Sequence, residues 1–388
     1  MNKVTDKLYN WASVYDEGTI EQAKITSSMN FVSPHLSLMP DAHLGKGSTV
    51  GSVVPTKGAI MPACVGVDIG CGMIAVKTTH TVNSIQEMDK KALRESIESQ
   101  IPLSAGKYNH KVKEDAQFYV TVLEQRAKEI VFEPDALDKN WRLQLGSLGS
   151  GNHFIEITKD EEGFIWLFLH SGSRGIGNKI AMKHIKIAKD ECKRLGAELQ
   201  DPDLAFLIRG TLEFQDYIDE MNWAQDFAQY NREVMMKRVV AAFTHHAGAF
   251  QVLDEINCHH NFTQRELHDG EYLWVTRKGA ISANLGQPGL IPGSMGTASY
   301  VVEGLGNPMS FNSAPHGAGR NFSRATARKT FTKEDLDIKM QGIEWSGSNA
   351  FIDEHPDAYK DIDVVMKDAE DLVVIKHTLN QLINIKGD

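Results

Sequence analysis

The sequence of 388 residues contains only four cysteines, at positions 64, 71, 192 and 258. Thiols that are so few and so scattered do not form a disulfide framework in a chain of this length, and we therefore expect reduced cysteines that are free to bind metal. No stretch reaches the roughly 18 apolar residues that a membrane-spanning helix needs, and the first residues lack the apolar core of a secretion signal. We therefore expect a cytoplasmic protein.

Positive charge is also scarce. The 41 Lys and Arg residues stand against 51 Asp and Glu residues, which gives a net charge of −10. This balance argues against a protein that coats nucleic acid over its whole surface, although it leaves room for a local basic groove. The hydrophobic content of 41% and the charged content of 24% are ordinary for a globular protein that forms one large domain or two smaller ones.

Two glycine-rich segments resemble nucleotide-binding loops without matching them. The run 45–49 (GKGST) lacks the Gly-Lys-Ser/Thr order of a phosphate-binding P-loop, because Gly47 follows Lys46. The run 146–151 lacks the acidic residue and the βαβ context of a dinucleotide-binding loop. Beside the first run, we favour Asp41 and His43 as turn residues that cap the backbone, with a role near a functional site as the alternative.

Apolar residues at helical spacing predict helices over 85–100, 114–131, 176–197 and 211–254. Continuous or β-rich apolar runs predict strands over 163–169 and 272–276, and residues 134–142 form a turn-rich link. Residues up to about position 34 form a polar opening segment with short helical patches. His245 and His246 fall in a core-packing helix, so we do not expect them to bind metal.

The run 65–72 (VGVDIGCG) places a carboxylate and a thiol among glycines that let the backbone bend tightly. A pair made of Asp68 and Cys71 suits a borderline transition metal better than Ca²⁺ or Mg²⁺. Without further ligands, a buried free cysteine beside a turn aspartate fits the same pattern.

Three histidines are candidates for the missing ligands. His153 follows a glycine loop at the start of a short alternating strand, and His170 ends the apolar strand before a second glycine loop. A histidine that is bonded only to the backbone is the alternative for His170. The run 258–260 (CHH) leaves the end of a predicted helix, and at most one of His259 and His260 joins a given metal site because adjacent side chains diverge.

Two later loops have the chemistry of a phosphate site. The run 286–300 is rich in turn-forming residues with exposed amides, which bind anions well. The run 315–320 (PHGAGR) holds His316 among small residues close to Arg320. A neutral imidazole can attack phosphorus and a nearby guanidinium can neutralise the phosphate, whereas the alternative is an ordinary turn histidine.

Seven segments together resemble the RtcB family of RNA-splicing ligases, in order and in content. They are 65–72, 149–156, 170–175, 257–261, 292–299, 316–320 and 386–387. The resemblance extends from Leu38 to the end of the chain. It implies a single α+β domain over residues 1–388, with mixed β-sheets flanked by helices around a central dinuclear metal cleft. Residues 1–35 form the N-terminal entry segment of this domain.

The resemblance implies two Mn²⁺ ions per subunit, with Zn²⁺ as the alternative. Asp68, Cys71 and His153 would hold one ion, and Cys71, His170 and His260 would hold the other. Cys71 would therefore bridge the two ions.

The resemblance also implies GTP as a co-substrate. His316 would attack its α-phosphate to give a GMP–histidine intermediate, and GMP would then pass to an RNA 3′-phosphate so that a 5′-hydroxyl can attack. A 2′,3′-cyclic phosphate end would first be opened. The expected GTP-binding residues are Asn152, His153, Phe154, Ile155, Glu156, His260, Asn261, Pro292, Gly293, Ser294, Met295, Ser299, His316, Gly317, Ala318, Gly319 and Lys386.

Candidates for contacts with the RNA backbone are Arg174, Arg320, Arg324 and Arg328, with a solvated helix face as the alternative for those after His316. Pro315 and residues 341–350 depart from the pattern of the family, so a specialised repair paralogue is compatible with the sequence. An activating partner protein is compatible with it as well. A metal-dependent cyclic phosphodiesterase and an RNA-binding paralogue without ligase activity are the alternative functions.

Overall fold

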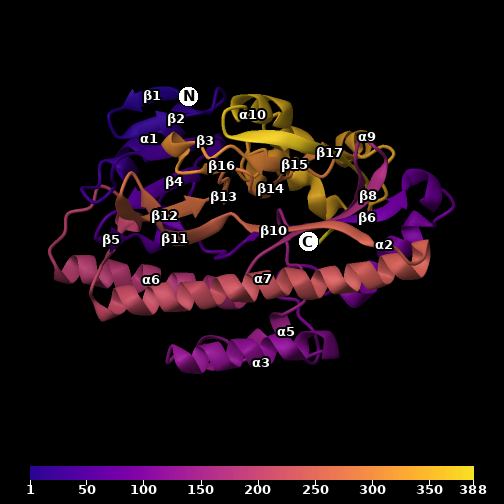
Figure 1. Cartoon of the computed structure of the whole chain (residues 1–388), viewed down its shortest axis with the longest axis horizontal. Coiled ribbons are helices and arrows are strands. Elements are labelled where there is room, and N and C mark those ends of the chain that lie inside the picture. Colours follow the sequence, from indigo (N-terminus) through magenta and orange to yellow (C-terminus); the bar gives the residue numbers. More distant parts are fainter.

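The computed structural model describes residues 1–388 and contains two large β-sheets stacked on layers of helices (Figure 1). The first sheet has six strands in the order β1-β2-β3-β4-β12-β11 and is mixed, because β2 and β3 run parallel. Its strands are β1 (Asn2–Thr5), β2 (Leu8–Asn10), β3 (Leu36–His43), β4 (Val50–Thr56), β12 (Glu271–Lys278) and β11 (Asn261–His268).

The second sheet has seven strands in the order β10-β6-β8-β7-β17-β15-β14, and every pairing in it is antiparallel. Its strands are β10 (Val252–His259), β6 (Gly72–Thr81), β8 (Phe164–Ser171), β7 (Phe154–Lys159), β17 (Val373–Lys386), β15 (Ser299–Gly304) and β14 (Pro288–Ile291). Two short pairs join β13 (Ala280–Ser282) to β16 (Ser313–Pro315) and β5 (Ala59–Ile60) to β9 (Leu207–Ile208).

In Figure 1, α3, α5, α6 and α7 lie below the sheets, α10 lies above them, and α1 lies at the upper left beside β1 and β2. The α-helices are α1 (Glu17–Ser27), α2 (Lys90–Gln100), α3 (Glu114–Glu129), α4 (Pro134–Leu137), α5 (Trp141–Gln144), α6 (Arg174–Arg194), α7 (Leu212–Ala247), α8 (Arg324–Thr330), α9 (Lys333–Lys339) and α10 (Ile362–Asp368). Short 3₁₀ turns are η1 (Pro62–Cys64), η2 (Val82–Ile85), η3 (Pro202–Leu204), η4 (Pro308–Ser310), η5 (Asn349–Glu354) and η6 (Pro356–Ala358). No helix is long and apolar enough to cross a membrane.

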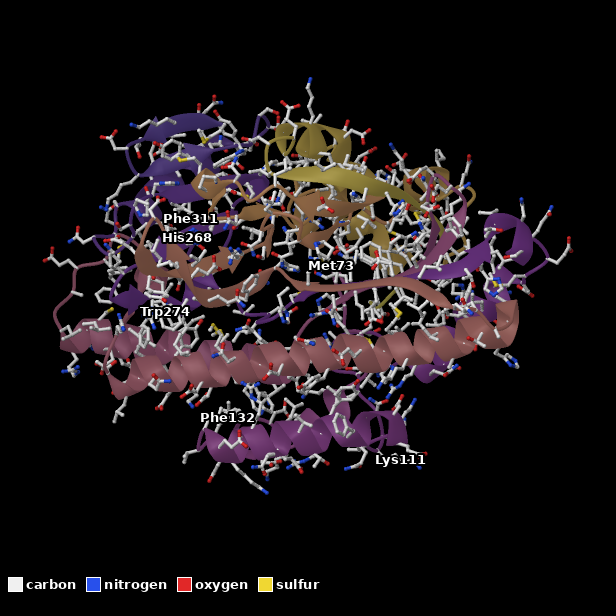
Figure 2. The ribbon with its side chains drawn as sticks, in the orientation of Figure 1. Met73, Lys111, Phe132, His268, Trp274 and Phe311 are labelled. Carbon is white, nitrogen blue, oxygen red and sulfur yellow. The ribbon has the colours of Figure 1, made fainter.

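Strand β6 shows why the layers stack as they do. Successive side chains of a strand point to opposite faces. Met73 packs into the core between the two sheets, where Figure 2 labels it, whereas Ile74 packs into the core between the seven-stranded sheet and the helices. At β6, the seven-stranded sheet is therefore apolar and covered on both faces.

Helix α7 runs almost the full length of the molecule between that sheet and α3 (Figure 1). It begins at Thr211, whose hydroxyl accepts a hydrogen bond from the Phe214 amide, and it ends at Gly248, where a positive φ of 93° reverses the chain. Its lower side packs against Phe132 next to α3, with the Trp223 ring 5.2 Å from that of Phe132 (Figure 2). A helix this long is stable because it is buried on two sides.

Most predicted elements are confirmed, including the strands now seen at 164–171 and 271–278 and the helix at 114–129. The predicted helix over 85–100 begins only at Lys90, and the link 134–142 contains the short helices α4 and α5. The prediction that a helix continues to residue 254 is wrong, because Gly248 ends it. Cys258 and His259 are consequently the last two residues of β10, an edge strand, and His260 follows it, so the run 258–260 does not lie at the end of a helix.

Candidate metal centre and nucleotide cavity

Adjacent strands of the seven-stranded sheet bring together three side chains that could hold a metal ion. Cys71 immediately precedes β6, His153 immediately precedes β7, and His170 lies near the end of β8, which pairs with both strands. In the register of the sheet, His170 lies opposite Met73 on one side and Phe154 on the other. The end of this sheet therefore concentrates residues that are far apart in the sequence.

The ligand atoms of these residues converge. The Cys71 sulfur lies 3.4 Å from Nε2 of His153 and 3.2 Å from Nε2 of His170, and all three side chains are buried. His260 adds its Nε2 at 2.9 Å from Nε2 of His170, and a carboxylate oxygen of Asp68 lies 3.0 Å from Nε2 of His153. The five residues that the sequence predicted as metal ligands thus form one group of side chains, which we call the metal cluster.

The opposite ring nitrogens of the histidines show which atoms are free to bind metal. Nδ1 of His153 donates to the Leu148 carbonyl at 2.9 Å, and Nδ1 of His170 donates to the Asn152 carbonyl at 3.1 Å. Because each proton is used on Nδ1, each Nε2 carries a lone pair that faces the cluster. Metal-binding histidines in proteins are oriented in this way.

The contact between His170 and His260 shows that a cation suits this cluster, because two ring nitrogens face each other there. Nδ1 of His260 lies 3.2 Å from the side-chain oxygen of Asn261, so its lone pair also points inward. Two lone pairs 2.9 Å apart repel each other unless positive charge lies beside them. The donor set of sulfur, imidazole nitrogen and one carboxylate therefore fits a borderline divalent cation.

Burial determines the protonation of these groups. It lowers the pKa of His170 and of His260 well below the usual value, which keeps both rings neutral. Burial and the Asp68 carboxylate raise the pKa of the Cys71 thiol, and a coordinated cation has the opposite effect because it deprotonates the thiol. Burial also opposes ionisation of Asp68, but its contact with His153 and the positive charge of Arg174 outweigh burial and lower the pKa of Asp68 to about 2.

Only one histidine of the run 258–260 faces the cluster, as predicted from the divergence of adjacent side chains. Nδ1 of His259 lies 2.9 Å from the Gly70 carbonyl oxygen and 3.2 Å from the Arg232 guanidinium, and this holds the ring away from the cluster. His260 is the residue that contacts His170. The preference for His260, which came from the family resemblance, agrees with this geometry.

A cavity of about 320 Å³ opens beside the metal cluster. Its walls come from the ends of several strands and from the loops 292–295 and 316–320. The predicted GTP-binding residues that line it are Asn152, Phe154, His260, Asn261, Pro292, Gly293, Ser294, Met295, His316, Gly317, Ala318, Gly319 and Lys386. His43, Asp68, Lys278, Arg320, Arg324 and Asn384 also line it.

Three further predicted GTP-binding residues lie behind the wall. Ile155 belongs to the core on the helix side of the sheet. The Glu156 carboxylate accepts a hydrogen bond of 2.7 Å from Asn384, which itself lines the cavity. The Ser299 hydroxyl accepts a hydrogen bond of 3.3 Å from the Gly293 amide and so supports the cavity loop from outside.

Glu156 is the most perturbed carboxyl group of this region. It is buried, and burial raises its pKa to about 8, while hydrogen bonding to Asn384 acts in the opposite direction. No cation contacts it within ion-pair distance. A polar ligand whose N–H groups reach this carboxylate would therefore favour its charged form.

His316 is held by an aspartate that the sequence analysis placed in a turn. The Asp41 carboxylate accepts hydrogen bonds from Nδ1 of His316 at 2.6 Å and from its backbone amide at 3.1 Å. Asp41 belongs to β3 and its side chain is completely buried, so the favoured interpretation of Asp41 and His43 as turn residues is wrong. The pattern of period two over β3 was the one available signal, because it predicts an inward-facing polar side chain.

The predicted RNA-binding arginines are restrained by acidic residues. Arg320 and Arg324 form ion pairs with Glu354, and Arg324 and Arg328 form ion pairs with Asp353. Both acids come from η5 and are almost completely buried. Arg320 and Arg324 line the cavity, whereas Arg328 lines a smaller neighbouring hollow.

Arg174 lies apart from this group, behind the metal cluster. Its guanidinium contacts Nδ1 of His153 at 3.5 Å and does not line the cavity. Gly149 makes room for it, because a Cβ atom on Gly149 would lie 1.9 Å from the guanidinium. The position of Arg174 suits support of the metal cluster from behind.

The fold and this site define a protein with a cluster of cysteine and histidine side chains that could hold a metal, beside a polar cavity that contains a histidine held by an aspartate. The family model described as "tRNA-splicing ligase RtcB" matches residues 22–387. The chain therefore belongs to the RtcB family.

Curated relatives agree with this assignment. The chain is 46% identical over 379 residues to the RNA-splicing ligase RtcB of Escherichia coli K12, covering 93% of this chain and 92% of the relative. It is 30% identical over 414 residues to the tRNA-splicing ligase RtcB of Pyrobaculum aerophilum, covering 89% of this chain and 85% of the relative.

Proposed function

We propose that this protein joins RNA ends that carry a 3′-phosphate or 2′,3′-cyclic phosphate to ends that carry a 5′-hydroxyl, through a GMP–histidine intermediate on His316. As a member of the RtcB family, the chain is an RNA ligase of RNA repair or tRNA splicing. The observation that supports the intermediate is the bond between Asp41 and His316. GTP and divalent metal ions are the proposed co-substrate and cofactor.

The contact with Asp41 favours the tautomer of His316 that can act as a nucleophile through Nε2. A proton held on Nδ1 by the carboxylate leaves the lone pair of Nε2 free in the cavity. In the first step this lone pair attacks the α-phosphorus of GTP, a P–N bond forms, and pyrophosphate leaves with the electrons of the broken P–O bond. Asp41 stabilises the positive charge that develops on the ring.

The metal cluster is the proposed site of two divalent ions, Mn²⁺ or Zn²⁺. Asp68, Cys71 and His153 would hold one ion, and Cys71, His170 and His260 would hold the other. Such ions act as Lewis acids that polarise phosphoryl oxygens. The short distance between the rings of His260 and His316, with centroids 4.5 Å apart, supports a reaction centre next to this cluster.

The guanine base is proposed to bind at the end of the cavity near Asn384. Behind this residue, the Glu156 carboxylate suits the N–H groups on one edge of guanine. Lys386 is proposed to contact the nucleotide as well, and its ammonium forms an ion pair of 3.1 Å with Glu354.

The second and third steps take place on RNA. An oxygen of the RNA 3′-phosphate attacks the phosphorus of the GMP–histidine, the P–N bond breaks, and the imidazole recovers its lone pair. The 5′-hydroxyl then attacks the activated 3′-phosphorus and GMP leaves. Arg320 and Arg324 at the cavity wall are proposed to contact the phosphates, with Arg328 further along.

Covalent labelling tests this proposal. GTP that carries ³²P at the α-phosphate, incubated with the protein and Mn²⁺, should leave an acid-labile label on the wild type and none on His316→Ala. A metal-dependent cyclic phosphodiesterase would open cyclic ends with no label, and an RNA-binding paralogue would show neither reaction. Absence of a label on the metal-loaded wild type would exclude the intermediate.

A further inference from the structure

The outer face of α6 carries a row of lysines that the site described above does not use. Their spacing of three or four residues places these side chains on one face of the helix. Together with Lys46 they line a hollow of about 610 Å³, which we call the lysine groove. Its residues are Lys46, Ala136, Leu137, Lys179, Met182, Lys183, Ile185, Lys186 and Lys189.

The lining of the lysine groove contains five ammonium groups and no carboxylate. Three of the lysines form ion pairs with acids that are less exposed than they are. The side chain of Lys179 is 49% exposed whereas its partner Asp138 is 12% exposed, and Lys183 is 36% exposed whereas its partner Glu220 is 8% exposed. The acids therefore contact the lysines from the buried side, and the ammonium groups remain accessible to solvent.

Two lysines of the groove have no acidic partner. Lys46 and Lys186 are exposed, and neither forms an ion pair. In a protein with a net charge of −10, unpaired ammonium groups in a hollow with no acidic lining form a local site for anions. A row of such groups along a helix of 21 residues suits an extended polyanion better than a single phosphate.

Two hydrogen bonds connect the elements that carry the groove to the wall of the nucleotide cavity. The carbonyl oxygen of Lys46 accepts a hydrogen bond from the ammonium of Lys278, which lines that cavity. At the start of α6, the backbone amide of Ser173 donates to the carboxylate of Asp68 at 3.1 Å. Helix α6 then extends from the middle of the molecule to its left-hand end in Figure 1. Lys46 and the start of α6 are thus each bonded to a residue that lines the nucleotide cavity.

We propose that the lysine groove binds the sugar-phosphate backbone of an RNA strand whose end lies in the nucleotide cavity. This inference rests on the proposed function as an RNA ligase. Lysine ammonium groups act as point charges that contact phosphates without reading bases, so binding in the groove is independent of sequence. The groove supplies the cationic surface that the overall charge of the protein lacks.

The test compares two double variants of equal charge. Lys46→Glu/Lys186→Glu alters the groove, and Lys107→Glu/Lys111→Glu alters two exposed lysines that also lack ion pairs. Figure 2 shows Lys111 at the lower right beside α3, away from the left-hand end of α6. Binding of a 20-nucleotide RNA with a 3′-phosphate is measured by fluorescence anisotropy from 50 to 300 mM salt.

We expect the groove variant to bind this RNA at least about tenfold more weakly than the wild type, because phosphate contacts dominate affinity. The slope of log affinity against log salt should become shallower by about 1.4, since each lost contact with a single strand removes about 0.7. The control variant should keep the affinity and slope of the wild type. Equal affinities and slopes for the two variants would overturn the proposal, as expected if the groove serves an acidic protein partner instead.

Two reactions separate this inference from the proposed function. Labelling of His316 by GTP, and joining of RNA pieces of about three nucleotides that are too short to reach along α6, should be unchanged in the groove variant, whereas joining of the 20-nucleotide RNA should slow. If the wild type is not labelled but the groove variant still loses RNA affinity, the proposed function fails and the groove stands. If joining of long and short RNA is equally unaffected, the groove proposal fails alone.

Discussion

The carboxylate of Asp41 lies 2.6 Å from Nδ1 of His316, although the two residues are 275 positions apart in the chain. The aspartate is completely buried, and its other oxygen has no hydrogen-bond partner. Asp41 therefore acts as a positioning residue, since it fixes the ring of His316 and the tautomer without reaching the cavity itself.

Replacement of Asp41 by asparagine should slow guanylylation of His316 by at least about 100-fold, because an amide can donate to Nδ1 and favour the wrong tautomer. The measurement is the single-turnover rate of labelling by GTP at saturating nucleotide. Metal content and GTP affinity should remain close to those of the wild type. Nitrogen NMR of the His316 ring should show the proton moved from Nδ1 to Nε2, and an unchanged tautomer with a reduced rate would contradict this role.

Replacement of Cys71 by alanine should remove bound divalent metal and abolish RNA joining, because this sulfur lies between His153 and His170. Metal content is measured by mass spectrometry after dialysis. Mn²⁺ should raise the melting temperature of the wild type but not that of the variant, since a ligand that binds only the folded state stabilises it.

Cys258→Ala is the matched control for that experiment. Cys258 lies two residues before His260, one of the proposed metal ligands, but does not belong to the cluster. This variant should keep its metal. Equal metal loss in both variants would show that disturbance of the strand ends, and not ligation by Cys71, releases the ion.

Replacement of Glu156 by glutamine should stabilise the metal-free protein, and the gain should grow between pH 5 and pH 8. Burial raises the pKa of Glu156 from 4.5 to about 8, so the folded state holds the proton more tightly than the unfolded state over this range. The penalty of the wild-type carboxyl group is absent below pH 4.5 and complete above pH 8. Urea unfolding across this range measures it.

Glu354→Gln is the opposite control, because charges from Lys386 and Arg324 outweigh burial and lower the pKa of Glu354 to about 2. Its stabilising effect is lost only as pH falls from about 4.5 through 2, so this variant should be destabilised by a constant amount from pH 5 to pH 8. A gain for Glu156→Gln that does not change with pH would contradict the assignment.

Replacement of Gly149 by alanine should destabilise the protein by about 2 kcal/mol or more, because the new Cβ atom would collide with the guanidinium of Arg174 at a position where φ is 96°. Gly163→Ala has a similar φ of 86° with nothing near the new Cβ, and it should cost only about 1 kcal/mol. Thermal unfolding of both variants separates the collision from the backbone strain. Equal losses would show that Arg174 moves aside freely.

The amino-acid sequence by itself determined the chemistry of the site. Asp68 and Cys71 among glycines, the histidine at the end of an apolar strand, and the loop around His316 are local patterns, and local patterns follow from backbone freedom and side-chain type. Residue order was also sufficient to indicate the family, which the family model then confirmed.

Only the tertiary structure decided which of these residues meet. The register of β6, β8 and β7 brings Cys71, His170 and His153 together, and hydrogen bonds between strands far apart in the chain set that register. The sequence analysis placed Asp41 in a turn because its partner is far away in the chain. That partner, His316, directly follows β16, a strand that pairs with β13 and not with β3. The helix predicted to reach residue 254 ended at Gly248 because one residue with positive φ reverses the chain there, and periodicity alone does not report such a reversal.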